Sequence, residues 1–342
     1  MQVLVTGGAG YIGSHTVLSL LQSQYDVVVL DNLSNSSVES IKRVEHITGK
    51  SVTFIEGDVC DKAKLRQVFS DYTIESVIHF AALKAVGESA QIPLSYYQTN
   101  VHGSVCLLEV MQENKVNNFI FSSSATVYGE ENQVPYVETM KLGTPSSPYG
   151  ATKVMVERIL ADVALANAKF RGVSLRYFNP IGAHESGMIG EDPKGIPNNL
   201  LPYVAQVAVG KRDKLSIFGD DYPTQDGSCE RDYLHVMDLA QGHVAALDWL
   251  NCHGDFTGVE AFNLGTGNGV SVFAIVNTFE QATDQRIPFE VSPRRAGDLA
   301  AFWANATKAN QALNWQAKRS LQQMMIDTWR WQSNNPNGYL EQ

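Results

Sequence analysis

The sequence predicts an α/β fold, with a doubly wound parallel sheet followed by a second, smaller α/β domain. Three observations support this prediction. Short apolar runs rich in β-branched residues recur through the first half of the chain, and longer helical patterns separate them. After Phe178 this alternation stops and glycine, proline and asparagine become frequent. Strands buried on both faces read as continuous apolar runs, and strands that alternate with helices favour a parallel sheet.

The first half of the chain alternates strand and helix signals. Strands are expected at residues 3–5, 27–30, 52–55, 77–80, 119–122 and 173–177. Helices are expected at residues 11–21, 62–71, 94–113 and 149–168. This alternation is typical of a parallel sheet with helices on both of its faces.

The second half begins with a loop-rich segment. Glycine, proline and asparagine gather through residues 179–199, and regular signals return at 201–209, 236–250, 261–264, 272–283, 307–313 and 321–331. We therefore predict a first domain over residues 1–180 and a second over residues 181–342, with residues 233–264 returning to the first.

The composition is that of an ordinary globular protein. The chain has 342 residues, of which 44% are hydrophobic and 18% charged, enough for two domains with cores of their own. The net charge is −10, which disfavours nucleic acid or an anionic membrane as a partner, because both attract positive surfaces.

Targeting and metal signals are missing from the pattern. No stretch approaches the ~18 apolar residues of a membrane helix, and the chain opens into a strand without the basic segment of a signal peptide. The cysteines are scattered and fit neither a zinc site nor a disulfide framework; they are Cys60, Cys106, Cys229 and Cys252. We expect no bound metal, reduced thiols and a cytoplasmic location.

A glycine-rich segment follows the first strand and opens the first helix. Gly7, Gly10 and Gly13 have the spacing G-x-x-G-x-x-G. Glycines allow a tight turn and a close approach to a pyrophosphate, while the helix N-terminus supplies free N–H groups. Alone, the spacing also suits a plain turn between strand and helix.

Acidic residues at the next two strand ends strengthen the dinucleotide interpretation. Asp31 lies about 20 residues past the loop, where a carboxylate accepts both ribose hydroxyls. Its charge would repel a 2′-phosphate, so NAD is favoured over NADP. Asp58 follows the third strand, where it could bind the adenine amino group; its alternative role is a helix N-cap.

Tyr149 and Lys153 stand four residues apart and share one face of a predicted helix. A phenol, with a reference pKa of about 10, needs a drop of roughly 3 units to act as a base near pH 7. The Lys153 charge and a positively charged nicotinamide ring would favour the phenolate. Ser124, beyond the fifth strand, could relay a substrate proton to Tyr149, although a serine run also caps turns.

Longer motifs extend over essentially the whole chain: TGGAGYIGSH, LDNLSNS, EGDV, HFAALKAVGES, FSSSATVYG, YGATK, LRYFNPIGAH, GIPNNL and RDYLHVMDLA. With them, the chain resembles the UDP-glucose/UDP-galactose 4-epimerase family of extended short-chain dehydrogenases/reductases. The resemblance implies a Rossmann fold, tightly bound NAD, and reversible C4 epimerisation of UDP-galactose and UDP-glucose through a 4-keto sugar. It implies that Tyr149 is the base, that Lys153 tunes it and holds the nicotinamide ribose, and that Ser124 bridges to the sugar.

The resemblance also implies a set of cofactor-binding residues. Lys84 matches a lysine that reaches the cofactor, and Thr99 stands where some relatives carry asparagine. The alternative for Lys84 is a solvated surface position. The expected set is Gly7, Gly10, Tyr11, Ile12, Gly13, Asp31, Asn32, Asn35, Ser36, Asp58, Val59, Phe80, Ala81, Lys84, Thr99, Asn100, Ser122, Tyr149, Lys153, Tyr177 and Phe178.

For the UDP sugar, the resemblance implies arginines on the diphosphate, an apolar edge for uracil and a carboxylate for ribose. The alternative for Arg231 is a salt bridge with Glu230 or Asp232, and the alternative for Arg294 and Arg295 is a solvated pair. The expected substrate-binding set is Ser124, Asn179, Asn199, Leu200, Ser216, Ile217, Phe218, Arg231, Arg295, Asp298 and Phe302.

Two places depart from the family pattern or vary within it. Cys229 and Glu230 stand where the family tends to have small residues, and a glutamate near a diphosphate lowers affinity unless it points away. Phe302 stands where relatives carry either a bulky aromatic or a small residue. Because a large ring should crowd a 2-acetamido group, we expect UDP-galactose and UDP-glucose to be strongly preferred over the N-acetyl pair.

Other functions share parts of this pattern. An NDP-sugar 4,6-dehydratase needs an Asp-Glu pair where this chain has Ala125 and Thr126. A 4-epimerase of another UDP sugar, a pentose or an N-acetylhexosamine, would carry the same motifs. A non-catalytic NAD sensor would have no use for Tyr149, Lys153 and Ser124.

The resemblance further implies a homodimer joined by two helices from each subunit. Here they would be the helices at 94–113 and 149–168. Val101, Val105, Leu108 and Val154 could supply an apolar face, or they could pack on their own sheet.

Overall fold

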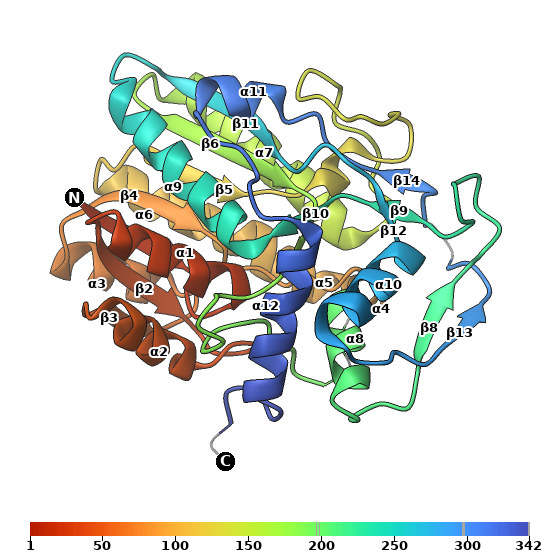
Figure 1. Ribbon diagram of the computed structural model, residues 1–342. Helices are drawn as coiled ribbons and strands as arrows, with labels where there is room; N and C mark the ends of the chain where they lie inside the picture. Colours follow the sequence, from red (N-terminus) through yellow and green to blue (C-terminus); the bar gives the residue numbers. More distant parts are fainter. Residues whose placement is uncertain (196, 198, 296–297, 341–342) are drawn as a thin grey trace.

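The computed structural model describes residues 1–195, 197, 199–295 and 298–340, so two positions of the GIPNNL motif lie outside it. A seven-stranded parallel sheet dominates the larger part of the chain, in the order β11-β6-β5-β4-β1-β2-β3 (Figure 1). Its strands are β1 (Gln2–Thr6), β2 (Asp26–Asp31), β3 (Thr53–Glu56), β4 (Ile74–His79), β5 (Asn118–Ser122), β6 (Arg171–Tyr177) and β11 (Gly258–Leu264).

Helices cover both faces of this sheet, which confirms the predicted doubly wound Rossmann architecture. One face carries α1 (Tyr11–Gln22), α2 (Val38–Thr48) and α9 (Val236–Cys252). The other carries α3 (Lys62–Asp71), α6 (Gly103–Glu113) and α7 (Pro148–Ala166). The chain starts at β1, next to the central strand β4, adds β2 and β3 on one side and then returns to add β4, β5, β6 and β11 on the other. Such a sheet binds ligands in the crevice at the carboxyl ends of its strands.

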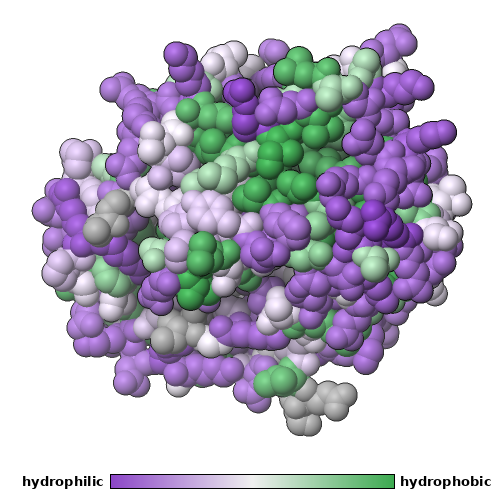
Figure 2. All heavy atoms as spheres, turned by 180° about the vertical axis from the view of Figure 1, so that it is seen from behind, coloured by the Kyte–Doolittle hydropathy of each residue, from purple (hydrophilic) through white to green (hydrophobic). Residues whose placement is uncertain are grey.

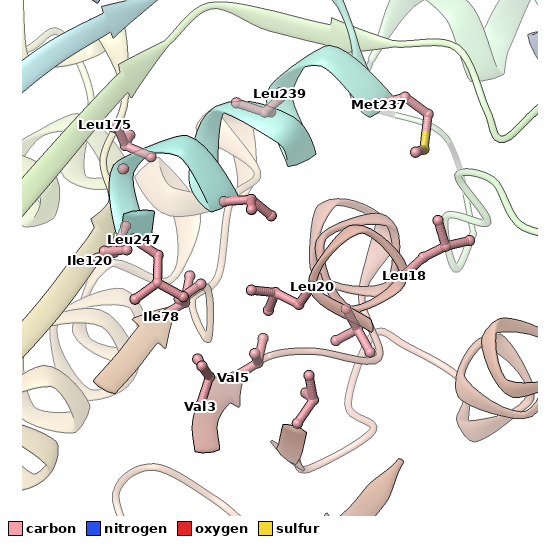
Figure 3. Close-up of a cluster of buried hydrophobic side chains, with 14 of the residues drawn as sticks. Val3, Val5, Leu18, Leu20, Ile78, Ile120, Leu175, Met237, Leu239 and Leu247 are labelled. Carbon is pink, nitrogen blue, oxygen red and sulfur yellow. The ribbon is translucent and has the colours of Figure 1, made fainter. Parts of the chain in front are cut away.

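The side chains of β1 show how the two cores are divided. Val3 and Val5 belong to the cluster with α1 and α9, drawn in Figure 3, whereas Leu4 belongs to the cluster with α3, α6 and α7. Alternate residues of a strand point to opposite faces, so one short strand contributes to both cores. All three residues are fully buried.

Local signals explain where several helices begin. Asp61 accepts a hydrogen bond from Lys64 N and caps α3, and Ser147 accepts one from Gly150 N and caps α7. Pro148 occupies the first turn of α7, where its missing N–H costs nothing. These caps agree with the predicted starts of both helices to within one residue.

One prediction about helices was wrong, and two helices were not predicted. Residues 94–113 do not form one helix: α5 (Pro93–Tyr96) is followed by a π-helical turn, η1 (Tyr97–His102), before α6 begins. The wider turn buries Asn100, whose side chain bonds to the backbone of Leu83. The sequence also gave no prediction for α2, or for α4 (Val86–Gln91).

The smaller part of the molecule holds short strands and three packed helices. Its helical core joins α8 (Leu200–Ala208), α10 (Val272–Thr283) and α12 (Leu321–Asn334). Its strands are β7 (Asn179–Ile181), β8 (Leu215–Phe218), β9 (Glu230–Arg231), β10 (Tyr233–His235), β12 (Val270–Ser271), β13 (Phe289–Ser292) and β14 (Ala301–Phe302). Helix α11 (Thr307–Ala312) packs instead in the core of the large sheet, through Ala309. Within residues 233–264, α9 and β11 belong to the large sheet and its layers, whereas β10 pairs with β7. The domain boundaries stay a prediction.

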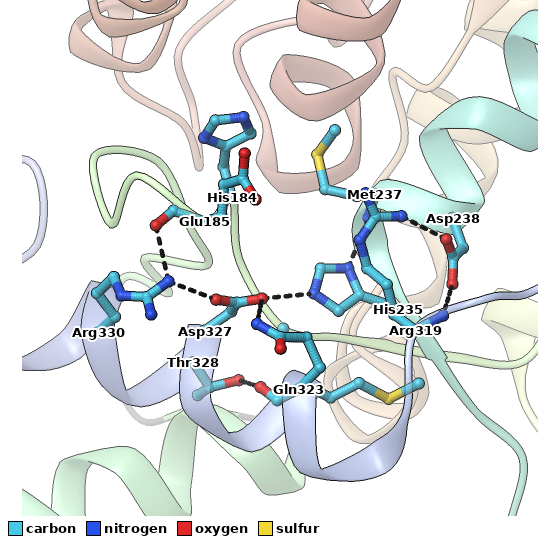
Figure 4. A network of polar contacts seen from close by, with 12 residues as sticks. His184, Glu185, His235, Met237, Asp238, Arg319, Gln323, Asp327, Thr328 and Arg330 are labelled. Carbon is cyan, nitrogen blue, oxygen red and sulfur yellow. Dashed lines mark hydrogen bonds and ion pairs between the residues drawn. The ribbon is translucent and has the colours of Figure 1, made fainter.

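Buried charges tie α12 to the start of α9 (Figure 4). The Asp327 carboxylate contacts His235 at 3.3 Å and accepts hydrogen bonds from Gln323 at 2.8 Å and Arg330 at 2.7 Å. Burial opposes the charged form, but the hydrogen bonds from His235 and Gln323 outweigh it and lower the pKa of Asp327. The network fixes the C-terminal helix against the larger sheet.

Within the described part of the chain, no helix combines the length and the apolar character needed to cross a membrane.

The packing in Figure 3 leads to a stability prediction for α1. Leu20 is fully buried there, so Leu20→Ala should lower the free energy of unfolding by about 2–5 kcal/mol, through lost burial and a residual cavity. Urea titration followed by circular dichroism measures the change. Gln22→Ala, at an exposed position of the same helix, should change it by less than about 0.5 kcal/mol, and equal effects of the two variants would contradict this packing.

Candidate active site

A cavity of about 970 Å³ opens at the carboxyl ends of β1, β2 and β4. It lies at the point where the strand order reverses, which is where the glycine-rich segment leaves β1. Most of the expected cofactor residues line it: Gly7, Gly10, Tyr11, Ile12, Gly13, Asp31, Asn32, Asn35, Ser36, Val59, Phe80, Ala81, Lys84, Thr99, Ser122, Tyr149, Lys153 and Tyr177.

The glycine-rich turn has no room for side chains at two of its positions. Gly7 has φ +70°, and a Cβ there would lie 2.6 Å from Ala81 N. At Gly13 a Cβ would lie 2.2 Å from Gly7 O. Gly10 caps α1 without a side-chain hydrogen bond, so the first amides of this helix stay available to an anion.

Asp31 is anchored at the end of β2. One oxygen accepts a hydrogen bond from Ala9 N at 3.0 Å; the other accepts from Leu33 N at 2.9 Å and from Ser36 Oγ at 2.7 Å. The carboxylate therefore joins the glycine-rich turn to the loop after β2, and its position at the cavity wall is fixed.

Asp58 does not line the cavity, although its neighbours Gly57 and Val59 do. Its carboxylate accepts hydrogen bonds from Asn32 Nδ2 and Cys60 N, both at 2.8 Å. Burial opposes the charged form, but these hydrogen bonds lower the pKa of Asp58. The alternative role as the N-cap of α3 is wrong, because Asp61 is the N-cap.

Tyr149 and Lys153 lie in the first turns of α7 and face the same cavity, as their spacing predicts. The Lys153 ammonium donates a hydrogen bond to Ser122 O at 2.8 Å and lies 5.8 Å from the centre of the Tyr149 ring. Ser122 in turn pairs with the Tyr177 hydroxyl at 2.7 Å. Helix α7 is thereby attached to the end of β5, where both side chains meet the sheet.

Burial dominates the protonation of both side chains. It raises the pKa of Tyr149 to about 12, and a hydrogen bond with Ser124 offsets this only in part. The direction is opposite to the drop that a base near pH 7 needs. Burial lowers the pKa of Lys153 to about 7. The negative charge of Glu157 acts in the opposite direction but only partly offsets this effect.

Ser124 lies beside Tyr149 and also caps a turn. Its Oγ accepts hydrogen bonds from Thr126 N at 3.3 Å and Thr126 Oγ1 at 3.1 Å, at the start of the 3₁₀ helix η2 (Ala125–Tyr128). Both interpretations of this serine are therefore compatible, since a hydroxyl that accepts two hydrogen bonds can still donate its own proton.

Residues 190–195 form a cavity wall that the sequence did not predict. Glu191 Oε1 accepts hydrogen bonds from Lys84 Nζ at 2.9 Å and from Asn199 Nδ2 at 2.8 Å. Lys194 Nζ donates to Leu33 O at 2.9 Å, so the segment reaches across to the loop after β2. Lys84 is half-exposed but paired, unlike a solvated surface lysine. The segment has no regular pattern that could have signalled it.

Two expected cofactor residues lie behind the cavity. Asn100 is buried in η1, where its amide donates to Thr152 Oγ1 at 3.0 Å. The ring centre of Phe178 lies 5.1 Å from that of Phe302, and both rings belong to the same buried cluster as Tyr136. Their proposed contacts with a cofactor stay predictions.

Part of the expected substrate set gathers around β9 and β14. The Arg231 guanidinium lies 3.3 Å from Asp298 Oδ1 and donates to Leu299 O at 2.8 Å. The alternative pairing of Arg231 with the side chains of Glu230 or Asp232 is wrong. Glu230 neighbours Gly269, on the opposite face of the strand from Arg231.

The rest of the substrate set lies along other elements. Arg295 stacks 3.8 Å above the Phe218 ring, while Arg294 pairs with Asp221 at 2.6 Å. Ile217 is fully buried in the helical core, which leaves only its backbone for a ligand. None of the expected substrate residues belongs to the described lining of the 970 Å³ cavity: Ser124, Asn179, Asn199, Leu200, Ser216, Ile217, Phe218, Arg231, Arg295, Asp298 and Phe302.

Comparison with known proteins places this geometry in a family. UDP-glucose 4-epimerase of Erwinia amylovora is 62% identical over 338 residues, covering 99% of each chain, and that of Bacillus subtilis is 55% identical over 339 residues, also covering 99% of each. The chain belongs to the UDP-glucose 4-epimerase family. The crystal structure of the Bifidobacterium longum member, in complex with NAD⁺ and UDP, matches with a TM-score of 0.95 and 50% identity, over 99% of this chain and 100% of that one.

The predicted resemblance to the UDP-glucose 4-epimerase family is thus confirmed over the full chain. A broader family profile, described as GDP-mannose 4,6 dehydratase, also matches residues 4–328. At the places where a dehydratase needs its acid and base, η2 carries Ala125 and Thr126, and Thr126 bonds to Ser124. Among the described residues, no group of three or more His, Cys, Asp or Glu side chains is arranged to hold a metal ion.

Proposed function

We propose that this protein interconverts UDP-galactose and UDP-glucose with a retained NAD, by removing and returning hydrogen at C4 of the sugar. One observation carries the proposal: Tyr149 and Lys153 open from α7 into the same cavity as the glycine-rich turn and Asp31. A redox cofactor held by the turn would therefore lie beside a candidate base. The Bifidobacterium longum family member binds NAD⁺ and UDP together.

The residues divide the chemistry between them. NAD⁺, when bound, supplies a reversible hydride acceptor. Tyr149 accepts the proton of the C4 hydroxyl, directly or through Ser124, and the hydride on C4 would pass to the bound NAD⁺, so that a 4-keto sugar is left. Turning of this ketone within the site exposes its opposite face, so returning the hydride and the Tyr149 proton inverts C4. Lys153 keeps positive charge beside the phenolate throughout.

Activation of Tyr149 depends on charge brought into the site. In the protein alone, burial holds the pKa of Tyr149 near 12, which is too high for a base at neutral pH. A cationic nicotinamide ring stabilises the phenolate and adds to the effect of Lys153. The phenolate form of Tyr149 is thus available near neutral pH only while the oxidised cofactor is in place, so proton removal and hydride removal occur in the same state of the site.

The uridine diphosphate part is assigned to the second half of the chain. Arg231 and Arg295 bind the diphosphate, Asp298 a ribose hydroxyl, and the Phe218 edge the uracil ring. The arginine interactions with Asp298 and Phe218 hold both guanidinium groups in place before the substrate arrives. Glu230 does not oppose the diphosphate, because it lies on the other face of β9.

Incubation with UDP-galactose and no added NAD tests this function first. We expect proton NMR to show conversion to a stable mixture with UDP-glucose. Tyr149→Phe should lower kcat by about 10²–10⁴-fold, because the proton acceptor is lost, while NAD released on denaturation stays at the wild-type amount. Conversion only with added NAD would reject tight retention, and no conversion even then would reject the proposed substrates.

Substrate choice is assigned to Phe302. Its ring lies 5.1 Å from the rings of both Phe178 and Tyr136, so neighbouring aromatics hold it in place. A sugar that carries a 2-acetamido group would need this space. A related crystal structure is that of a UDP-Glc/GlcNAc 4-epimerase from Campylobacter jejuni, 38% identical with a TM-score of 0.83, so the wider group includes enzymes with the broader specificity.

Phe302→Ala should therefore raise the ratio of kcat/KM for UDP-N-acetylgalactosamine to that for UDP-galactose by at least about 10-fold. Coupled assays with both substrates measure the ratio. Phe302→Tyr keeps the ring and should leave the ratio near wild type. Comparable turnover of both substrates by the wild-type protein would refute the size argument.

We also propose a cytoplasmic homodimer that uses α7. Leu165 is 87% exposed and Met155 43% exposed on this helix, and Leu94 on α5 is 81% exposed. Figure 2 shows an apolar area on the rear face of the molecule, surrounded by hydrophilic residues. Large exposed apolar areas are typical of interaction sites. Leu108 on α6, by contrast, is buried in the core of its own subunit, which agrees with the alternative that it packs on its own sheet.

Leu165→Asp should therefore shift the particle from about twice the chain mass to one chain mass, because it places a charge in the proposed apolar interface. Size-exclusion chromatography with light scattering measures this. Val291→Asp, at an exposed apolar position on β13, should leave the mass unchanged. A monomeric wild-type protein would contradict the homodimer.

A further inference from the structure

A buried ion pair lies one helical turn beyond Lys153. Glu157 on α7 and Arg176 on β6 are 7% and 6% exposed. The guanidinium approaches the carboxylate with both Nε and Nη2, at 3.0 Å and 2.6 Å. Such paired hydrogen bonds fix direction as well as charge. Neither residue lines the cavity described above.

The Glu157 carboxylate also holds the end of β5. Ser123 Oγ donates to Glu157 Oε1 at 2.6 Å. Ser123 lies between Ser122, whose carbonyl accepts the hydrogen bond from Lys153, and Ser124, which lies beside Tyr149. One carboxylate therefore anchors the segment on which the proposed base, its lysine and its serine are aligned.

The electrostatic surroundings of Lys153 make this carboxylate matter for charge as well. The titratable groups that act on Tyr149 or Lys153 are His79 on β4, Tyr177 on β6 and Tyr96 on α5, besides Glu157. Tyr96 donates a hydrogen bond to Glu88, which lines the same cavity. Burial together with the Lys153 charge lowers the pKa of His79 to about 3, so this imidazole is neutral near pH 7. Burial raises the pKa of Tyr177 above its usual value, so it is neutral as well.

The charge of Glu157 raises the pKa of Lys153. Arg176 offsets that charge through the buried ion pair. Removal of one leaves the other buried and uncompensated, in surroundings where charge acts over several ångströms. On the far side, the Arg176 Nη1 donates to Tyr128 OH at 3.2 Å, which keeps the guanidinium in place.

We propose that Glu157 and Arg176 form a positioning unit of the active site, which aligns the Ser122–Ser124 segment and balances the charge around Tyr149 and Lys153. The inference rests on the proposed function for its kinetic consequences. Its structural basis, the contacts of Glu157 with Arg176 and Ser123, does not depend on that function.

Charge-removing variants of opposite sign test this proposal. Glu157→Gln leaves the Arg176 charge unbalanced, which favours loss of protons from Tyr149 and Lys153. Both limbs of the pH profile of kcat should then move to lower pH by at least about 0.5 units. Arg176→Gln leaves a buried carboxylate, so both limbs should move to higher pH. The double variant Glu157→Gln/Arg176→Gln should return the profile toward wild type.

A purely structural role gives a different result. It would lower kcat at every pH without moving either limb of the pH profile, and that result overturns the proposal. Shifts of the same sign in the two single variants overturn it as well. If Glu157→Gln does not fold, Arg176→Gln alone tests the proposal: both limbs of its pH profile must move to higher pH. Glu113→Gln, which removes the partner of exposed Arg66, is the matched control and should not move the profile.

Ultraviolet titration of the Tyr149 phenolate supplies a readout that needs no turnover. The difference spectrum between each variant and the same variant with Tyr149→Phe should show the same signed shift in midpoint. A signed shift here, with no turnover of UDP-galactose by the wild-type protein, would overturn the proposed function and retain the positioning unit. An unshifted midpoint overturns the positioning unit.

Discussion

The close approach of Gly7 to the backbone after β4 constrains the rest of the site. A Cβ at Gly7 would lie 2.6 Å from Ala81 N, so β1 and β4 can turn away from each other only through a residue without a side chain. That divergence opens the cavity, and the same turn leaves the amides of α1 free. Asp31, which bonds to Ala9 N, then holds the turn from its other side.

Around this turn the fold holds two titratable side chains rigidly in surroundings that disfavour their charged forms. Tyr149 and Lys153 each sit where the low dielectric disfavours the charged form. The protein thereby keeps Tyr149 protonated and weakens the hold of Lys153 on its proton until charge arrives from outside. Hydrogen bonds at the end of β5 hold Tyr149 and Lys153 in place before a ligand binds. The entropy lost in aligning these groups is therefore lost on folding and not on binding.

The sequence predicts most of the elements that position the site, and capping explains its successes. The helices at 62–71 and 272–283 were predicted to the residue, because Asp61 and Ser271 mark their starts. Helix α2 was missed although its sequence carries a helical signal, because Val38, Ile41, Val44 and Ile47 recur at helical spacing and Ser37 caps its start. The break inside 94–113 has no comparable signal, since a π turn is a short local widening between residues that remain helical on both sides.

The sequence predicts the cofactor side of the site better than its remaining walls. Glycine spacing and strand-end carboxylates are local signals, readable in a few residues. The contacts of Glu191 with Lys84 and Asn199 join segments far apart in the chain, and no local pattern encodes them. Ile217 shows a different limit, because a resemblance names a position without saying that its side chain faces the core. Its expected contact with the substrate, through the backbone, stays a prediction.

The cavity wall has one further consequence, for the order of events during synthesis. Tyr339 and Leu340 line the cavity whose floor is built from Gly7 to Gly13. The Tyr339 hydroxyl bonds to Gly190, and its amide bonds to Asp192, so residues more than 300 positions after the glycine-rich turn fasten the opposite wall of its cavity. A ribosome must therefore release the chain as far as Tyr339 before the nucleotide-binding half, although made earlier, has all of its walls.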